Sequence, residues 1–282
     1  MTVYLQDRFV REAEARVSVF DRGFLYGDGL FETVRAYGGR LFLWEGHWER
    51  LVAGAGMLGI PLPGTGPALR EVAGELLRRN GHGDGTVRIQ VTRGPGVRGY
   101  SPRGAGPPTL VITTHPAAPL EAPFPGPWRL RTASLRLWSG DPTVCAKTTS
   151  KLLQVLARAE AEAEGADEAL LLNDRGEVAE TAAGNVFWFE GGRWCTPMLE
   201  SGGLAGVTRR WMLGLLGRLG WPHAEVRRGV EGWREVEAVF VTLSSHGLVA
   251  VSEWDGHRWP ADPRIGRLQE GYREAVRSIL SH

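Results

Sequence analysis

The spacing of apolar residues changes along the first 115 residues, from alternation to a helical repeat. Alternation between charged turns is typical of short strands, and a Gly-Gly pair between two such runs is typical of a hairpin. Strands are predicted over Val3–Leu5, Phe9–Val10, Val17–Phe20, Leu30–Tyr37, Arg40–Leu43, Val87–Arg93 and Thr109–Thr114. Helices are predicted over Trp44–Leu58 and over Ala68–Arg79, which ends at Asn80–Gly81.

A proline-rich segment then separates the chain into two parts. Five prolines lie between Pro116 and Pro127, and such a segment is stiff and lacks backbone donors, so it suits a connector better than a core element. At 282 residues the chain also exceeds the usual size of one domain. We therefore expect an N-terminal α+β domain over residues 1–115, a linker over 116–127 and a C-terminal domain over 128–282.

The second part again combines strands with helices. A strand begins near Trp128, and the helix Ser150–Glu164 ends at Gly165. This helix is expected to bury Leu152, Leu153, Val155, Leu156 and Ala159. Further strands are predicted over Ala169–Leu172, Val178–Glu180, Asn185–Phe189, Arg193–Thr196 and Ala238–Leu243, and helices over Val207–Leu219 and Ile265–Leu280.

Composition is typical of soluble globular proteins and gives no reason to expect a highly charged partner. Apolar residues make up 43 % of the chain, charged residues 23 %, and the net charge is +1. Binding to nucleic acid or to an anionic membrane is therefore not expected. The first residues carry charges throughout, and no apolar stretch approaches the ~20 residues that cross a bilayer, which predicts a cytoplasmic protein acting on a small metabolite. Cys145 and Cys195 have no further ligand at metal-binding spacing, so a metal site is not expected. A cytoplasmic protein usually keeps its thiols free, so a disulfide is not expected either.

The basic residues are almost all arginine. Of 33 lysines and arginines, only Lys147 and Lys151 are lysine. A guanidinium stays protonated, whereas a lysine amine can lose its proton in a suitable pocket and attack a carbonyl carbon. The pair raises the hypothesis of Schiff-base chemistry. The alternative is that an arginine-rich composition left two lysines by chance on a solvated helix face.

If the carbonyl partner were pyridoxal phosphate, the chain would also need a carboxylate for the pyridine nitrogen and donors for a phosphate. Glu180 ends a strand expected to be buried, where a carboxylate needs a cationic partner, although an arginine beside an edge strand would serve. The glycine-rich loop 202–206 leads to Val207–Thr208 at a helix N-terminus, which is a common type of anion site. Arg50 lies on the core-facing side of its helix, where it needs either an anion or a position at the helix rim.

These features occur in order along the stretches Phe20–Leu51, Lys147–Gly192 and Cys195–Arg209. Together the stretches resemble the class IV (fold type IV) pyridoxal-phosphate enzymes, which include D-amino acid transaminase, branched-chain transaminase and 4-amino-4-deoxychorismate lyase. The resemblance covers nearly the whole chain. It implies a two-domain α+β fold, pyridoxal 5'-phosphate as cofactor, and an active site between the domains near the subunit interface of a homodimer.

The resemblance also implies roles for individual residues. Lys147, and not Lys151, would form the Schiff base, and Glu180 would contact the pyridine nitrogen. The cofactor phosphate would be bound by Arg50, Val207, Thr208 and a hydroxyl of Ser244 or Ser245. The substrate would be bound by Phe31, Arg98 and Tyr100. The family usually has asparagine where this chain has Ser150, and Lys151 would lie at the surface or tune the Schiff base.

The loop Arg98–Pro102 resembles the lyase most closely, although D-amino acid transaminases also place an arginine there. The resemblance therefore favours conversion of 4-amino-4-deoxychorismate to 4-aminobenzoate and pyruvate, with Lys147 as general base. The alternatives are a transaminase of D-amino acids or branched-chain amino acids, and a non-catalytic small-molecule binding protein of the same fold.

Overall fold

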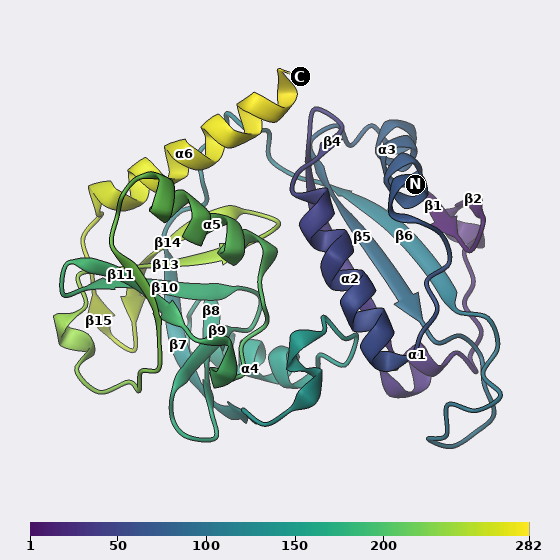
Figure 1. Cartoon of the computed structure of the whole chain (residues 1–282), viewed down its shortest axis with the longest axis horizontal. Coiled ribbons are helices and arrows are strands. Elements are labelled where there is room, and N and C mark those ends of the chain that lie inside the picture. Colours follow the sequence, from purple (N-terminus) through teal and green to yellow (C-terminus); the bar gives the residue numbers. More distant parts are fainter. Residues whose placement is uncertain (282) are drawn as a thin grey trace. The chain divides into compact units, whose positions relative to one another are not determined.

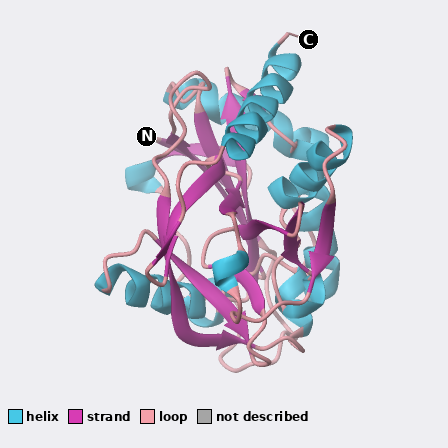
Figure 2. Ribbon diagram, turned by 90° about the vertical axis from the view of Figure 1, so that its left-hand side faces the viewer, coloured by secondary structure: helices cyan, strands magenta, loops and turns pink. Residues whose placement is uncertain are grey.

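The computed structural model describes residues 1–281, with the main chain alone at residue 234. The described chain forms two compact units. The first contains Met1–Ala122, Ala146–Lys151 and the chain from Val276 onward, and the second contains Pro123–Cys145 and Leu152–Ala275. Each unit combines strands with helices. Figure 2 shows both kinds of element through the described chain, so the predicted mixture of α and β elements is confirmed.

The first unit is built on a six-stranded antiparallel sheet in the order β2-β1-β6-β5-β3-β4. Its strands are β1 (Thr2–Leu5), β2 (Arg8–Arg11), β3 (Gly29–Tyr37), β4 (Arg40–Leu41), β5 (Gly85–Thr92) and β6 (Thr109–Pro116). Its helices are η1 (Glu12–Glu14), α1 (Arg22–Tyr26), α2 (Trp44–Leu58) and α3 (Gly66–Asn80). α2 and α3 lie along the sheet (Figure 1), and their apolar residues share one core with residues of β3, β5 and β6.

The segment Ala146–Lys151 belongs to the first unit, although its place in the chain predicts the second. The carbonyl of Lys147 accepts a hydrogen bond from the Phe31 amide, and the Thr149 amide donates to the Gly29 carbonyl, each at 2.9 Å. Ala146 is also buried in the first unit's core. The segment lies with the first unit because it pairs with the free edge of β3. The domain bounds 1–115 and 128–282 stay a prediction.

The chain end differs from that expectation as well. α6 (Pro263–Leu280) begins in the second unit, but its last turns belong to the first. There the Arg40 guanidinium donates to the Ile279 carbonyl at 2.9 Å. Residue 282 lies outside the described residues. The passage from first to second unit at Ala122–Pro123 falls within the proline-rich segment 116–127.

The second unit contains a nine-stranded mixed sheet in the order β12-β11-β10-β13-β14-β7-β8-β9, with β15 paired to β14. Its strands are β7 (Trp128–Leu137), β8 (Glu168–Asn173), β9 (Val178–Thr181), β10 (Asn185–Glu190), β11 (Arg193–Pro197), β12 (His223–Val226), β13 (Ala238–Leu243), β14 (Gly247–Trp254) and β15 (His257–Arg258). The other helices are η2 (Pro142–Cys145), α4 (Leu152–Ala163), η3 (Leu199–Ser201), α5 (Val207–Arg218) and η4 (Trp233–Glu235). α5 and α6 contribute Met212 and Leu268 to the core around Phe187 and Phe240, whose rings stack 4.8 Å apart.

The predicted buried face of α4 is wrong. Leu152, Val155 and Leu156 are 69 %, 60 % and 50 % exposed, and Ala159 is exposed as well. The buried face instead carries the small residues Ala157 and Ala161, which pack against β7 and β8 together with the partly buried Leu153. Small side chains allow the helix to lie close to the sheet, and the larger apolar residues are left on the opposite face.

Most other predicted elements are confirmed to within two residues at each end. The exception is Val17–Phe20, which forms an exposed turn and not a strand. Apolar and polar residues do alternate in this segment, but Val19 and Phe20 are exposed and do not pack in a core of the chain. The sequence did not indicate α1, β12, β14 or β15. No helix among residues 1–281 has both the length and the apolar character needed to cross a membrane.

Candidate active site

Lys147 is held at the edge of β3 by the turn that precedes this strand. Gly27 adopts a left-handed conformation with φ 67°, and its carbonyl accepts a hydrogen bond of 2.7 Å from the Thr149 hydroxyl. A Cβ atom at Gly29 would lie 2.7 Å from the Val91 carbonyl, so the close approach of the strands requires glycine. These contacts fix the backbone of Lys147 and place its Nζ 4.6 Å from the centroid of the Phe31 ring.

A second cation lies over the same ring. The Cζ atom of Arg88 is 3.8 Å from the centroid of Phe31. Along β5, Val87 and Ile89 are buried in the helix-covered core, whereas Arg88 and Gln90 are only partly buried, as expected for alternate faces of a strand. The Arg88 Nε and Nη2 atoms donate to Oε1 of Gln90 at 3.3 and 3.2 Å. This face of the sheet therefore carries two basic groups, those of Lys147 and Arg88, over one ring.

Behind β3, a buried carboxylate joins two side chains of α2. Glu32 is 1 % exposed and accepts hydrogen bonds of 2.7 Å from the Nε and Nη2 atoms of Arg50, and its Oε2 lies 2.7 Å from Nδ1 of His47. Burial alone would raise the pKa of Glu32, but the hydrogen bonds from Arg50 and His47 and their charges lower it to about 2. Because an ionised carboxylate only accepts, Nδ1 of His47 carries the proton.

Arg50 was predicted to bind a phosphate, and the structure gives it a carboxylate partner. Glu32 takes two of the five N–H donors of the guanidinium in a two-pronged pair. This pair fixes the plane of the guanidinium group. Binding of phosphate by Arg50 stays a prediction, now with Glu32 as the residue that orients it.

In the second unit, Glu180 is buried on β9 and is fastened to the glycine-rich loop. Its Oε2 accepts a hydrogen bond of 2.9 Å from the Leu204 amide, and the Asn185 side-chain amide donates to the Leu204 carbonyl at 2.9 Å. The buried strand predicted around Glu180 is confirmed. Its contact with a pyridine nitrogen stays a prediction.

The loop 202–206 leads into the N-terminus of α5 with very little free space. A Cβ atom at Gly206 would lie 1.9 Å from Oδ1 of Asn185, and one at Gly203 would lie 2.7 Å from the Ala179 carbonyl. Gly206 is the N-cap and has no side chain to accept the first amide groups of the helix, where Val207 and Thr208 are buried. Backbone N–H groups and a threonine hydroxyl at a helix start can bind an anion.

Ser244 and Ser245 lie in the turn between β13 and β14, in the same unit as Glu180 and Thr208. Both are partly exposed, and the Ser245 hydroxyl lies 2.8 Å from Nδ1 of His246. A phosphate role for either hydroxyl stays a prediction.

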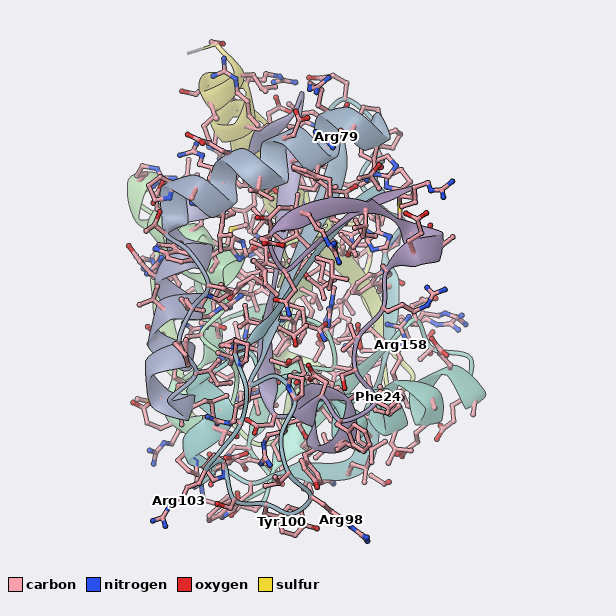
Figure 3. The ribbon with its side chains drawn as sticks, turned by 90° about the vertical axis from the view of Figure 1, so that its right-hand side faces the viewer. Phe24, Arg79, Arg98, Tyr100, Arg103 and Arg158 are labelled. Atoms are coloured by element: carbon pink, nitrogen blue, oxygen red, sulfur yellow. The ribbon has the colours of Figure 1, made fainter. Side chains whose placement is uncertain are left out.

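Arg98 and Tyr100, which were predicted to bind substrate, lie at the tip of an exposed loop with their side chains pointing away from the ribbon (Figure 3). Tyr100 is 87 % exposed. The loop is anchored from below by Arg22, which donates to the carbonyls of Gly99, Tyr100 and Ser101 at 2.9–3.1 Å. These hydrogen bonds hold the loop with the side chains of Arg98 and Tyr100 pointing away from the chain. The structure therefore does not bring either residue to Lys147 of the same chain.

Comparison with known proteins identifies the family of the chain. The sequence profile described as amino-transferase class IV matches residues 29–254. A putative branched-chain-amino-acid aminotransferase of Methanocaldococcus jannaschii is 36 % identical over 99 % of this chain and 96 % of its own length. The chain belongs to the class IV amino-transferase family. The family resemblance seen in the sequence is thus confirmed.

Relatives within class IV carry out more than one reaction. An aminodeoxychorismate lyase of Vibrio harveyi is 31 % identical over 90 % of this chain and 93 % of its own length. A D-alanine aminotransferase of Staphylococcus epidermidis is 30 % identical over 98 % of both chains. Among solved structures, the T.th. branched-chain amino acid aminotransferase with pyridoxamine 5'-phosphate superposes with a TM-score of 0.90 at 28 % identity, covering 98 % of this chain and 93 % of that one. Membership of class IV therefore leaves the reaction open.

Three residues of this class IV chain lie near Lys147 or Arg50 but were not singled out from the sequence, namely Glu32, His47 and Arg88. Glu32 had a visible signal, because it occupies an inward position of a strand whose other inward residues are Leu30 and Val34. A carboxylate in such a row needs a cation. Arg88 had no comparable signal, because partly buried arginines on strands are common where one face of the sheet is open.

Each unit by itself carries residues whose chemistry fits pyridoxal phosphate. Lys147 supplies an amine, Glu180 a buried carboxylate, and the start of α5 a tight backbone cradle that a Cβ at Gly206 would fill. Ser150, at the position where the family usually has asparagine, is exposed and packs against Gly27, and Lys151 is partly exposed. No group of three or more His, Cys, Asp or Glu side chains within residues 1–281 is placed to hold a metal ion.

Proposed function

We propose that this protein is a pyridoxal-phosphate-dependent transaminase of amino acids. The observation that carries the proposal is the position of Lys147, whose backbone is fixed on β3 and whose Nζ lies over the Phe31 ring. The cofactor is pyridoxal 5'-phosphate. When bound, it takes up the electron pair left on the substrate α-carbon after proton removal.

Different residues of the chain would bind the cofactor and move the substrate proton. Lys147 would hold the cofactor through Nζ, and once a substrate amine had replaced it, the freed Nζ would act as the general base that takes the α-proton of the substrate. The buried carboxylate of Glu180 would keep the cofactor's ring nitrogen protonated, because a buried anion favours a cationic partner. The cofactor phosphate would be held by the amides of Val207 and Thr208, the hydroxyls of Thr208 and Ser244 or Ser245, and the guanidinium of Arg50.

Transamination is favoured over the lyase reaction that the sequence suggested. The relative at 36 % identity over nearly the whole chain is described as an aminotransferase. The second candidate is the conversion of 4-amino-4-deoxychorismate to 4-aminobenzoate and pyruvate, favoured by the loop Arg98–Pro102 and by relatives described as aminodeoxychorismate lyases.

A homodimer is part of the proposal. The apolar face of α4 formed by Leu152, Val155 and Leu156 is uncovered in the single chain, and exposed apolar clusters of this kind are typical of interaction surfaces. Arg98 and Tyr100 can contact a substrate only from the outside of their own first unit. A second copy would cover the apolar face and would bring these two residues to the substrate of its partner.

The cofactor claim is tested by spectroscopy on two matched variants. Wild-type protein with pyridoxal phosphate is expected to show the absorbance band of an imine, Lys147→Ala to lose it, and Lys151→Ala to keep it. Borohydride reduction followed by peptide mass spectrometry should locate the cofactor on Lys147. A band that survives in Lys147→Ala, or no band in wild type, would overturn the claim and would favour a non-catalytic binding protein.

The reaction is tested separately on the same preparation. D-alanine, L-leucine and 2-oxoglutarate distinguish transamination by amino-group transfer, and release of 4-aminobenzoate from aminodeoxychorismate detects the lyase reaction. Release of 4-aminobenzoate without amino-group transfer would replace the proposed reaction by the second candidate.

A further inference from the structure

Arg88 is a partly buried cation for which the described residues provide no carboxylate. Its guanidinium hydrogen bonds go to the neutral side chain of Gln90, and no Asp or Glu among residues 1–281 lies within ion-pair distance of it. Two enclosed arginines do have such a partner, Arg22 with Asp28 and Arg50 with Glu32. Arg35 is buried without a carboxylate and donates instead to backbone carbonyls. A guanidinium cannot escape the cost of burial by losing its proton, so the site favours an anion from outside the chain.

The position of Arg88 relative to Lys147 indicates which anion Arg88 binds. Both side chains lie over the ring of Phe31, with Cζ of Arg88 at 3.8 Å and Nζ of Lys147 at 4.6 Å from its centroid. The two cationic groups can therefore be no farther apart than the sum of these distances. An amino acid has only one bond between its α-carbon and its carboxylate carbon, so a substrate whose α-carbon lay beside Nζ would have its carboxylate near the Phe31 ring, over which Arg88 is the second cation.

We infer that Arg88 binds the carboxylate of the substrate and holds the α-carbon beside Nζ of Lys147, with the Phe31 ring as the wall that positions both groups. The inference rests on the proposed function of Lys147. It defines the substrate class as amines that carry a carboxylate next to the reacting carbon, and it excludes simple amines as good substrates. It also assigns carboxylate recognition to the same chain as Lys147, in contrast to Arg98 on the exposed loop.

Burial supports this assignment, because it lowers the pKa of Arg88 and no charge from a nearby carboxylate offsets the effect. A planar guanidinium can grip a carboxylate with two parallel N–H donors. Nε and Nη2 face Gln90 in the absence of substrate, and these long hydrogen bonds to a neutral oxygen are easily exchanged for charge-assisted ones. A phosphate has the same chemistry, so the test must distinguish the substrate carboxylate from the cofactor phosphate.

The experiment compares Arg88→Gln and Arg88→Lys with Arg98→Gln and with Arg70→Gln, a control on the surface whose partner is Glu45. Each holoprotein is titrated with 4-methylvaleric acid, an unreactive carboxylate, and the change in the cofactor band or in melting temperature reports binding. The same variants are then given D-alanine or L-leucine, and isopropylamine, which lacks the carboxylate. Pyridoxal phosphate affinity is measured on the apoproteins.

Arg88→Gln is expected to weaken binding of 4-methylvaleric acid and to raise KM for the amino acid by about 10- to 100-fold, as for the loss of a charge-assisted pair. Arg88→Lys should recover part of this loss, and the rate with isopropylamine should change little. Unchanged carboxylate binding in Arg88→Gln overturns the inference, as does a loss confined to pyridoxal phosphate affinity, which would assign Arg88 to the phosphate. Absence of the imine band in wild type would instead contradict the proposed function, so the two failures are distinguishable. A general loss of folding would lower the melting temperature of all Arg88 variants without ligand.

Discussion

The guanidinium of Arg50 and the carboxylate of Glu32 form a two-pronged ion pair inside the first unit, with both hydrogen bonds at 2.7 Å. The acid lies on an inward position of β3 and the base on α2, so the pair ties the helix to the strand whose edge holds Lys147. An arginine proposed to bind phosphate is thus oriented by a residue that would not touch the cofactor. This arrangement makes Glu32 a positioning residue.

Glu32→Gln is expected to cost about 3–5 kcal/mol of folding stability, because removing one member of a buried pair leaves the other charge uncompensated. Pyridoxal phosphate affinity should fall as well, because the guanidinium of Arg50 loses its fixed plane. Urea unfolding and cofactor titration of the apoprotein measure the two effects. Glu75→Gln is the matched control, since Glu75 also pairs with two basic side chains, Arg78 and Arg79, but on the surface, where ion pairs contribute little. Equal stability losses in both variants would contradict the buried role of Glu32.

The same cluster predicts a loss of stability in acid that begins above pH 6. Burial lowers the pKa of His47 below its usual 6.5, against the effect of its hydrogen bond to Glu32, so the unfolded chain takes up this proton first as the pH falls through 6.5. The pKa of Glu32 is lowered from 4.5 to about 2, so its contribution is complete above pH 4.5 and is lost as the pH falls toward 2. Each group adds a slope of up to about 1.4 kcal/mol per pH unit within its window.

Urea unfolding between pH 8 and pH 3 measures this dependence. His47→Gln should flatten the slope just below pH 6.5. Glu32→Gln should reduce the slope at lower pH, where other carboxylates with lowered pKa values, such as Asp28 and Asp262, still contribute. A free energy of unfolding that is constant from pH 7 to pH 4 in wild type would show that the cluster does not hold its protons as the structure indicates.

The loop that carries Arg98 and Tyr100 should loosen when its anchor is shortened. Arg22 donates to three successive carbonyls and pairs with Asp28 at 2.8 Å, and a lysine cannot reach all four acceptors from one nitrogen. We expect Arg22→Lys to raise the rate of tryptic cleavage after Arg98 and Arg103 by about tenfold or more, since each lost hydrogen bond contributes on the order of 1 kcal/mol to local stability. Arg70→Lys serves as the surface control. Cleavage at the wild-type rate would mean that the loop is held by contacts other than Arg22.

How much of the fold the sequence predicts depends on whether the signal is local. The helix Trp44–Leu58 is confirmed at both ends, because it follows the glycine hairpin closely and ends where Gly59 adopts a left-handed conformation. The pairing of the segment Ala146–Lys151 with Gly29 and Phe31 was not predicted, because these partners lie more than a hundred residues earlier in the chain. Periodicity along a sequence carries no information about such distant pairing.

The candidate site shows the same limit. Lys147 could be singled out by residue type and by family resemblance. Glu32, the carboxylate partner of Arg50, and Arg88, the second cation over Phe31, lie far from it in the sequence and were not singled out. On α4, the most apolar face of the helix was taken for the buried one. The structure buries Ala157 and Ala161 instead, because close packing on β7 and β8 requires small residues, and this left Leu152, Val155 and Leu156 outside the core.

That exposed face predicts the outcome of a charge substitution. Val155→Glu should leave the folding of the single chain nearly unchanged, because Val155 is 60 % exposed. In a homodimer that buries this face, the same change places a charge in an apolar contact and should weaken association by about 100-fold or more. Light scattering over a series of protein concentrations measures the molecular mass in solution and so the fraction of dimer. Val52→Glu, at an exposed apolar position on α2, is the control, and a Val155→Glu protein that stays dimeric at low concentration would remove α4 from the interface.

The glycine at the start of α5 provides a test of the phosphate cradle. A Cβ atom at Gly206 would lie 1.9 Å from Oδ1 of Asn185, and Asn185 also holds the Leu204 carbonyl. Gly206→Ala should therefore displace the loop that donates to Glu180, cost about 1–3 kcal/mol of stability as other overpacked sites do, and lower pyridoxal phosphate affinity at least tenfold.

Gly56→Ala is the matched control for this substitution. Gly56 lies within α2 and an added Cβ meets no atom within 4 Å, so alanine there should raise stability by about 0.5–1 kcal/mol through its helix propensity. Both variants are compared by urea unfolding and by cofactor titration of the apoprotein. If Gly206→Ala loses stability but keeps wild-type cofactor affinity, the displaced loop is structural and the amides of Val207 and Thr208 do not hold the phosphate.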